Sequence, residues 1–237
     1  MLTKRHLPRI LYLLCFFATI APLRSQEQST FQVWVEETAV SSLADRWVGS
    51  LFLTQYFVDG SRKYASVSVC PAVSFAITPW LLAEGALFME YADQSDISDI
   101  IELRPYVALR YTDVISRFEP YVMLRQEFRN LYYLDTKTWQ DQYRLRLRIG
   151  SRIAITDERI APNSLYAIAE VEFFENLDPA PKEYFNSRIR LHAGLGYRFG
   201  DLWTGELHYM AQKSRSYPNQ PFDSQDNILR FTVRKAF

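Results

Sequence analysis

Arginine recurs at every second position in two segments of the chain, and this spacing indicates where charged chemistry is concentrated. In Tyr143-Arg-Leu-Arg-Leu-Arg-Ile149, three arginines alternate with apolar residues. Residues 188–199 repeat the pattern, with His192 at one of the polar positions. An extended strand points successive side chains to opposite faces, so each segment would present a basic face and an apolar face. Arginine on such a face is suited to bidentate ion pairs with carboxylates.

Residue types that support catalysis or metal binding are sparse. His192 and His208 have Gly194 and Met210 two residues later, and therefore lack the His-x-Ser pair found in outer-membrane lipid hydrolases. These histidines and Cys70 are too far apart in sequence to show a metal-ligand spacing, and no phosphate loop or dinucleotide motif occurs. We expect no catalytic residue, metal or cofactor. A lipid-modifying enzyme in which His192 or His208 is the base stays open as an alternative.

Composition describes a chain that can form a large apolar surface. Hydrophobic residues make up 48% of the 237 positions, and 27 basic side chains match 27 acidic ones. A net charge of zero gives no reason to expect nucleic acid as a partner.

The first 25 residues are typical of a secretory signal peptide. Lys4 and Arg5 stand in a basic segment, residues 10–20 are apolar, and cleavage after Ser25 would leave residues 26–237 as the mature domain. The apolar run is shorter than the roughly 20 residues that a membrane-spanning helix needs. Removal of the leader would leave Cys70 as the only thiol, so we expect no internal disulfide.

The remaining chain alternates with period two, which favours strands over helices. Eleven strands are expected, at residues 31–39, 46–57, 64–77, 80–92, 100–112, 117–129, 142–155, 164–174, 187–199, 202–213 and 227–237. Several exceed the 5–6 residues usual in soluble sheets and match the roughly 9–11 that cross a membrane. Short turns alternate with longer polar stretches such as 130–141, as in outer-membrane barrels.

These features predict an all-β fold: a transmembrane antiparallel up-and-down β-barrel of 10–12 strands. Bacterial single-chain barrels have even strand numbers, so either 31–39 is not a full strand or a twelfth was missed; we favour twelve. The terminal Phe237, after an alternating apolar segment, resembles the C-terminal signal that directs insertion of such barrels. A soluble exported barrel of the lipocalin type, with apolar side chains inside, is the alternative.

The polar face of the strands would line the barrel lumen. The residues that we expect there are Arg125, Arg144, Arg146, Arg148, Arg188, Arg190, Arg198, Glu102, Glu127, Glu170, Glu172, Glu206, His192 and His208. Further charged residues on the same face are Arg104, Arg110, Arg129, Arg152, Arg230, Arg234, Glu84 and Glu90. Ion pairs could fill this interior and make the barrel structural. Alternatively, the surplus of arginine would make a narrow, porin-like pore that favours anions or binds an acidic ligand.

Aromatic residues cluster near the expected strand ends. They are Tyr56, Phe57, Trp80, Tyr91, Tyr111, Phe128, Tyr197, Phe199 and Trp203. Their positions are typical of the girdles that membrane barrels place at the two membrane–water interfaces.

Several short motifs, in order along the chain, resemble one family. They are Trp34 followed by a turn and Arg46-Trp47; residues 143–148; Glu170-Val-Glu-Phe-Phe-Glu-Asn176; Arg188-Ile-Arg-Leu before Gly194-Leu-Gly-Tyr197; and His208-Tyr-Met-Ala-Gln212. The chain resembles a family of Gram-negative outer-membrane β-barrels, frequent in Bacteroidota, that is catalogued as domain of unknown function 2490. The resemblance implies a barrel in the outer membrane and transfers no functional residue. The expected partners are outer-membrane lipids, the barrel-insertion machinery and a small solute or acidic ligand.

Overall fold

The structure is a computed structural model that describes residues 28–58, 63–93, 98–177, 187–215 and 224–237. The predicted signal peptide, residues 1–25, lies outside the described residues. The described part of the chain folds into eleven strands. They are β1 (Gln28–Ala44), β2 (Trp47–Val58), β3 (Lys63–Ala76), β4 (Leu81–Ala92), β5 (Ile100–Thr112), β6 (Phe118–Tyr133), β7 (Thr138–Ala154), β8 (Leu165–Asn176), β9 (Ser187–Phe199), β10 (Trp203–Arg215) and β11 (Ser224–Ala236).

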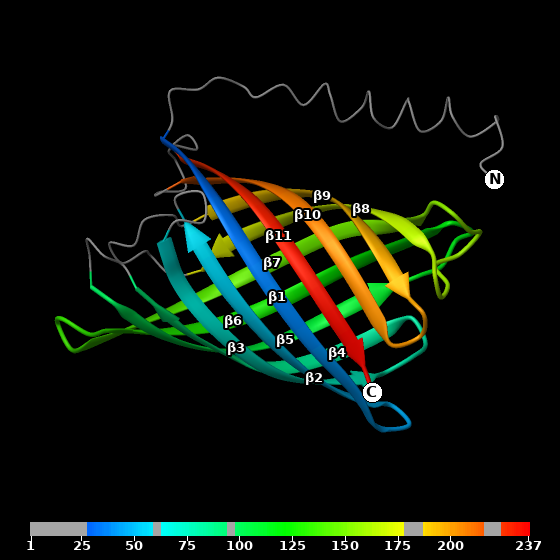
Figure 1. Ribbon diagram of the computed structural model, residues 1–237. Coiled ribbons are helices and arrows are strands. Elements are labelled where there is room, and N and C mark those ends of the chain that lie inside the picture. The colour runs from blue at the N-terminus through cyan, green and yellow to red at the C-terminus, as the bar shows by residue number, and fades with distance from the viewer. Residues whose placement is uncertain (1–27, 59–62, 94–97, 178–186, 216–223) are drawn as a thin grey trace.

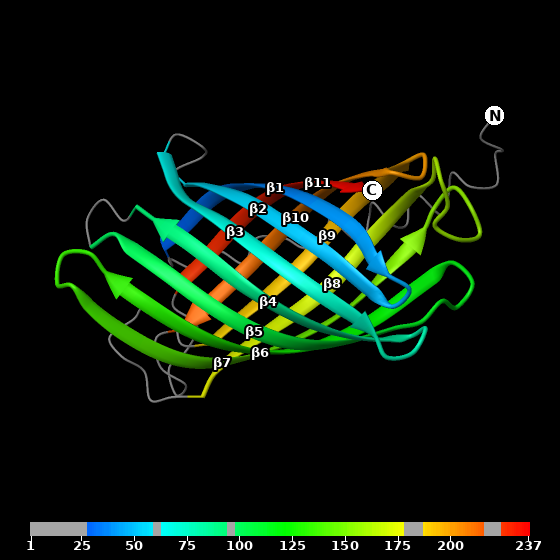
Figure 2. The same cartoon turned by 90° about the horizontal axis from the view of Figure 1, so that it is seen from below.

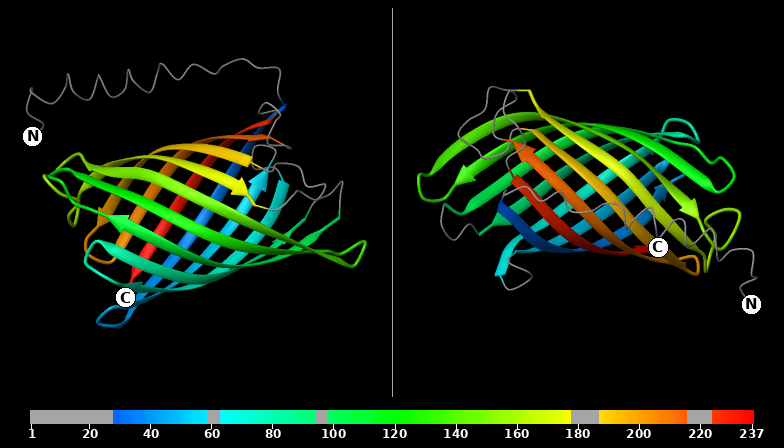
Figure 3. Two further views of the ribbon diagram at one scale, coloured as in Figure 1. Left: turned by 180° about the vertical axis from the view of Figure 1, so that it is seen from behind. Right: turned by 90° about the horizontal axis from the view of Figure 1, so that it is seen from above.

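The strands form one closed barrel in which each strand pairs antiparallel with the next in sequence. Figure 1 shows β1 and β11 side by side, where they close the barrel. Their pairing is parallel and extends from Gln28–Ser224 to Val40–Ala236. Figures 2 and 3 show the same tilted strands from three further sides. The all-β barrel of 10–12 strands is therefore confirmed.

The closing pair corrects two details of the sequence prediction. Segment 31–39 is part of a full 17-residue strand, β1, and the described strands number eleven rather than twelve. With an odd number of strands, the first and last run in the same direction, so the barrel closes in parallel and is not antiparallel throughout. The expected loop at 130–141 was also wrong, because β6 continues to Tyr133 and β7 begins at Thr138.

Alternation along the strands decides which side chains face inward. In β7, Arg144 and Arg146 are buried inside the barrel, whereas Tyr143 and Ile149 are exposed outside. β-branched and aromatic residues favour the extended conformation on such a pleated surface. The tight turn after β9 uses Gly200 at φ 60°, a left-handed conformation that glycine adopts without steric cost.

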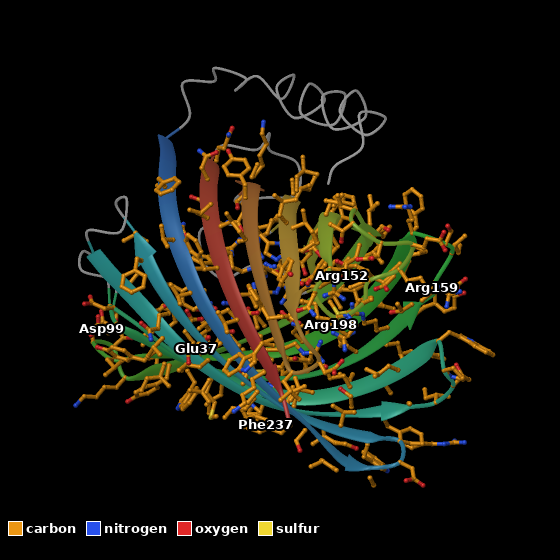
Figure 4. The ribbon with its side chains drawn as sticks, turned by 45° about the vertical axis from the view of Figure 1, so that its right-hand side comes forward. Glu37, Asp99, Arg152, Arg159, Arg198 and Phe237 are labelled. Atoms are coloured by element: carbon orange, nitrogen blue, oxygen red, sulfur yellow. The ribbon has the colours of Figure 1, made fainter. Side chains whose placement is uncertain are left out.

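The two rims of the barrel are defined by the chain direction. We call the rim where β1 ends and Phe237 lies the C-terminal rim, and the opposite one, where β1 begins, the N-terminal rim. The connections after β2, β4, β6, β8 and β10 lie at the N-terminal rim, and those after the odd-numbered strands lie at the C-terminal rim. In Figure 4, Asp99 after β4 and Arg159 after β7 lie on opposite sides of the barrel, as this arrangement requires.

The outer surface of the barrel is predominantly apolar. Val107, Leu191 and Leu195 are 64%, 56% and 52% exposed although they occupy strand interiors. An exception is Glu37 on β1, which is exposed (Figure 4) and has Leu53 and Val233 as its cross-strand neighbours. An exposed apolar surface of this extent is unusual for a soluble monomer.

Aromatic side chains form pairs on the outer face near both rims. Trp47 and Phe75 lie 4.8 Å apart, centroid to centroid, near the C-terminal rim. Near the N-terminal rim, Tyr132 packs against Trp139 at 4.9 Å, and a second such pair joins β6 to β7. Tyr56 was expected in this group, but it points inward, where its hydroxyl lies 3.3 Å from that of Ser68.

Candidate functional site

The inner face of the barrel encloses one continuous cavity of about 1630 Å³, lined by residues of all eleven strands. Thr30 and Val58 line it near the N-terminal rim, and Trp80 and Leu202 line it near the C-terminal rim. The interior is therefore partly filled by side chains and partly open. This cavity is the candidate functional site.

Thirteen arginines line the cavity, and all come from β5, β6, β7, β9 and β11. They are Arg104, Arg110, Arg125, Arg129, Arg144, Arg146, Arg148, Arg152, Arg188, Arg190, Arg198, Arg230 and Arg234. β8 and β10 lie between arginine-bearing strands; β8 contributes carboxylates instead, and β10 contributes a carboxylate and a histidine. Opposite charges therefore face each other across neighbouring strands, an arrangement that stabilises a sheet through cross-strand pairs.

Two fully buried carboxylates are the centres of an ion-pair network. Glu127 on β6 lies 2.5 Å from a guanidinium nitrogen of Arg144 and 2.6 Å from one of Arg146. Glu172 on β8 lies 2.7 Å from Arg146, 3.0 Å from Arg148 and 3.3 Å from Arg190. Arg146 therefore joins the two carboxylates. Buried charges need such partners, because a charge without a partner at low dielectric is costly.

The network continues toward the N-terminal rim and around the wall. Glu102 on β5 accepts bidentate hydrogen bonds from Arg104 and Arg129 at 2.6–3.0 Å. Arg190 donates to the side-chain oxygen of Gln212 at 2.5 and 3.0 Å, and its guanidinium carbon lies 5.0 Å from the centre of the Trp34 ring. One wall of the lumen, from β5 to β10, is thus a connected layer of charged and hydrogen-bonded side chains.

Glycines on the inner face allow two tyrosines to reach across a strand. Tyr121 on β6 lies over Gly150 on β7, and its hydroxyl donates to Glu170 on β8. A Cβ atom on Gly150 would come within 2.8 Å of the tyrosine ring. Aromatic side chains that cover strand glycines in this way help to fix register.

The same arrangement recurs two strands further on. Tyr166 on β8 lies over Gly196 on β9 and donates to Glu206 on β10 at 2.6 Å. A side chain at Gly196 would overlap the ring of Tyr166. The glycines are therefore required by the close approach of the tyrosines.

Both histidines lie in this wall, each beside one of these carboxylates. Nδ1 of His192 is 2.7 Å from Glu170, and Nε2 of His208 is 2.9 Å from Glu206. The two rings are nearly perpendicular, with centroids 6.5 Å apart, and both are almost fully buried. Both histidines thus lie on the inner face, away from the apolar outer face of the barrel.

The residues expected in the lumen all lie on the inner face. Eleven of the fourteen line the cavity; Glu127, Glu172 and His192 are buried in the ion-pair layer. Phe237 is 70% exposed at the C-terminal rim, and its backbone N–H donates to Val40 of β1 at 2.9 Å.

Sequence reasoning missed several acidic residues of the lumen. Glu36, Asp93, Glu119, Asp201 and Asp226 all line the cavity. Glu36 could have been recognised, because it alternates with Trp34 and Thr38. With these residues, ten acidic residues line the cavity and two more, Glu127 and Glu172, lie buried behind it, against thirteen arginines. The surplus on which the anion preference rested is therefore reduced to one charge.

The wall formed by β1–β4 differs from the rest of the lumen. Its cavity-lining side chains are mainly small or hydroxylated; Thr38, Thr54, Ser66, Ser68 and Ser74 are buried. Small side chains leave room, so the open part of the lumen lies against this wall. Cys70 on the same wall packs in a small apolar cluster with Tyr106, Ala108 and Met123.

Within the described ranges, no cluster of three or more His, Cys, Asp or Glu side chains is placed to hold a metal ion. The described residues contain no helix long and apolar enough to cross a membrane.

The fold and the lumen together define a closed β-barrel with an apolar outer surface and a charged interior. The family model described as "Protein of unknown function (DUF2490)" matches residues 31–222, and the chain belongs to this family. No curated protein and no solved structure matches the chain.

Proposed function

We propose that the protein is an outer-membrane β-barrel of a Gram-negative bacterium. The observation that carries the proposal is the distribution of side chains: Val107 and Leu195 are exposed on the outside, whereas Glu127 and Arg144 are buried inside. A lipocalin-type soluble barrel has the opposite arrangement. Lipid would cover the apolar outer face, and the aromatic pairs near both rims would lie at the two interfaces.

Two further features support a membrane location. The strands have 12–17 residues, enough for a tilted strand to span a bilayer, which requires about 9–11. Apolar residues alternate on the outer face of the last strand, and the exposed Phe237 that follows it is suited to recognition by the barrel-insertion machinery.

Within the membrane, we propose that the barrel acts as a narrow passage for small polar solutes. The cavity of about 1630 Å³ supports this function, because it reaches residues at both rims and runs beside the small side chains of β1–β4. The ion-pair layer on the opposite side would narrow and stiffen the passage without closing it. A purely structural barrel would instead be filled across its full width.

The location is tested by fractionation. We expect the protein to remain with outer membranes after a carbonate wash and to migrate differently on a gel before and after boiling, since folded membrane barrels resist detergent at room temperature. Recovery as a soluble periplasmic protein would refute the membrane location. The passage is tested with purified protein in planar bilayers, where we expect small conductance steps; a silent bilayer that contains folded, inserted protein would leave only the structural role.

A further inference from the structure

The charges of the lumen are nearly balanced in number but unequally distributed among its strands. Among the described side chains of β1–β4, those that line the cavity include Glu36, Glu84 and Glu90 and no arginine or lysine. Asp93, directly after β4, adds a fourth carboxylate on the same side. All thirteen cavity-lining arginines lie on the β5–β11 side.

The arginine side keeps a positive surplus after its own carboxylates are counted. That side carries eight acidic residues, and two of them, Glu127 and Glu172, are buried behind the lining. Set against the thirteen arginines, they leave a surplus of five positive charges. Arg110, Arg230 and Arg234 have no ion pair within 4 Å among the described residues. These arginines are therefore available to a solute.

Arg110 and Arg234 lie near the C-terminal rim, and Arg230 lies midway along β11. Arg198 and Arg234 both flank Thr204 in the pairing of β9, β10 and β11. Figure 4 shows Arg152 and Arg198 in the same part of the barrel. One side of the passage is thus electropositive over several strands.

The carboxylates of the β1–β4 side are held in place by hydrogen bonds and make only long ion pairs with arginines. Glu84 accepts hydrogen bonds from Tyr106 and Ser74 at 3.0 and 3.2 Å, and its nearest arginine nitrogen, on Arg125, lies 4.0 Å away. Glu90 accepts from a serine at 2.7 Å, and its nearest arginine nitrogen is 3.9 Å away. These separations are at the outer limit of ion pairing, so both carboxylates can still interact with a solute.

We infer that this lumen selects small dipolar solutes that carry a cationic and an anionic group, such as free α-amino acids. This inference rests on the proposed passage and names its substrate class. The arginine side would hold the carboxylate of the solute and the β1–β4 side its ammonium group. A simple anion would be attracted to one side and repelled by the other, so the walls would hardly raise its concentration in the passage.

Four three-carbon compounds test the inference, because they share a frame and differ in charge. Alanine is zwitterionic, lactate is anionic, alaninamide is cationic in mildly acidic buffer, and lactamide is neutral. Their uptake into proteoliposomes is measured with radiolabel, and uptake into protein-free liposomes is subtracted. We expect alanine to enter about tenfold faster than lactate or alaninamide, at the lower end of the effect that fields of this kind have on local solute concentration.

Substitution of the acidic side should change the order of uptake. The triple variant Glu36→Gln, Glu84→Gln, Glu90→Gln keeps hydrogen-bond acceptors in place but removes three negative charges, so lactate should overtake alanine. The single variant Glu36→Gln should move uptake in the same direction and serves if the triple variant does not fold. Glu158→Gln, at an exposed position in the connection after β7, is the matched control and should leave the order unchanged.

The outcomes separate the two proposals. Equal uptake of all four compounds, or lactate uptake faster than alanine uptake in the unmodified protein, would overturn the dipolar selection and leave the passage intact. An order unchanged by loss of the carboxylates would also overturn it. Uptake of none of the compounds by folded, inserted protein would refute the passage itself.

Discussion

Replacement of Glu172 with glutamine would remove a negative charge that three arginines share. The carboxylate is fully buried and lies 2.7–3.3 Å from Arg146, Arg148 and Arg190. Glutamine keeps the shape, but its amide group would direct N–H donors toward guanidinium groups that are themselves donors. Removal of one partner from a buried ion pair costs about 3–5 kcal/mol. With three arginines affected, we expect the free energy of unfolding to fall by about 4 kcal/mol.

The assay is reversible urea unfolding of the barrel in lipid vesicles or detergent micelles, followed by circular dichroism and tryptophan fluorescence. Glu158→Gln removes the same charge from an exposed position and should change the free energy of unfolding by less than about 0.5 kcal/mol. Comparison of the two variants separates the effect of the network from the effect of net charge.

A second substitution tests whether charge imbalance causes the loss. Arg190→Gln in the Glu172→Gln background removes one of the cations that have lost their carboxylate, so the double variant should be less destabilised than the sum of the two single variants. A Glu172→Gln variant as stable as the Glu158→Gln control would refute the role of the ion-pair layer. If the two losses of stability are strictly additive in the double variant, Glu172 and Arg190 do not interact, although they lie 3.3 Å apart.

Two further substitutions test the inner and outer faces. Gly196→Ala should lower the free energy of unfolding by about 2 kcal/mol, because the new methyl group displaces Tyr166 from Glu206. The same change in a Tyr166→Ala background should lower it much less. An equal loss of stability in both backgrounds would refute the overlap between the methyl group and the ring. Glu37→Leu should raise the free energy of unfolding in lipid by about 1–2 kcal/mol, because a carboxylate on a lipid-facing surface is unfavourable; a loss of stability would contradict lipid contact at this position.

Alternation in the sequence was enough to predict which residues share a face. Arg144, Arg146 and Arg148 share a face because they alternate with apolar residues, but period two alone left open whether that face is inside or outside the barrel. The strand ends were harder to predict. The aromatic and polar residues around Tyr132 and Trp139 resemble a loop, but they pair on the outer face and extend both strands.

Contacts that cross strands could not be predicted from alternation. Nothing local to Gly150 indicates that the ring of Tyr121 covers it, because that contact depends on the register of β6 against β7. The parallel closure of β1 with β11 was missed because an even number of strands was assumed. Only the observed pairing of the two strands shows that the number is odd. Glu36 was missed although the segment 31–39 that contains it was expected to be a strand.

One side of the lumen mainly stabilises the fold, and the other mainly determines which solutes pass. The charged groups of the β5–β10 wall are mostly satisfied by one another, as at Glu127 and Glu172, so they contribute to folding and are largely occupied. The β1–β4 wall has small side chains, open space and carboxylates that lie at the limit of ion pairing, so it contributes less to folding and more to contact with a solute. Substitutions on the two sides should therefore have opposite consequences. Glu172→Gln should weaken the barrel, whereas Glu36→Gln should change which solutes pass while the free energy of unfolding remains nearly the same, since Glu36 has no ion pair among the described residues.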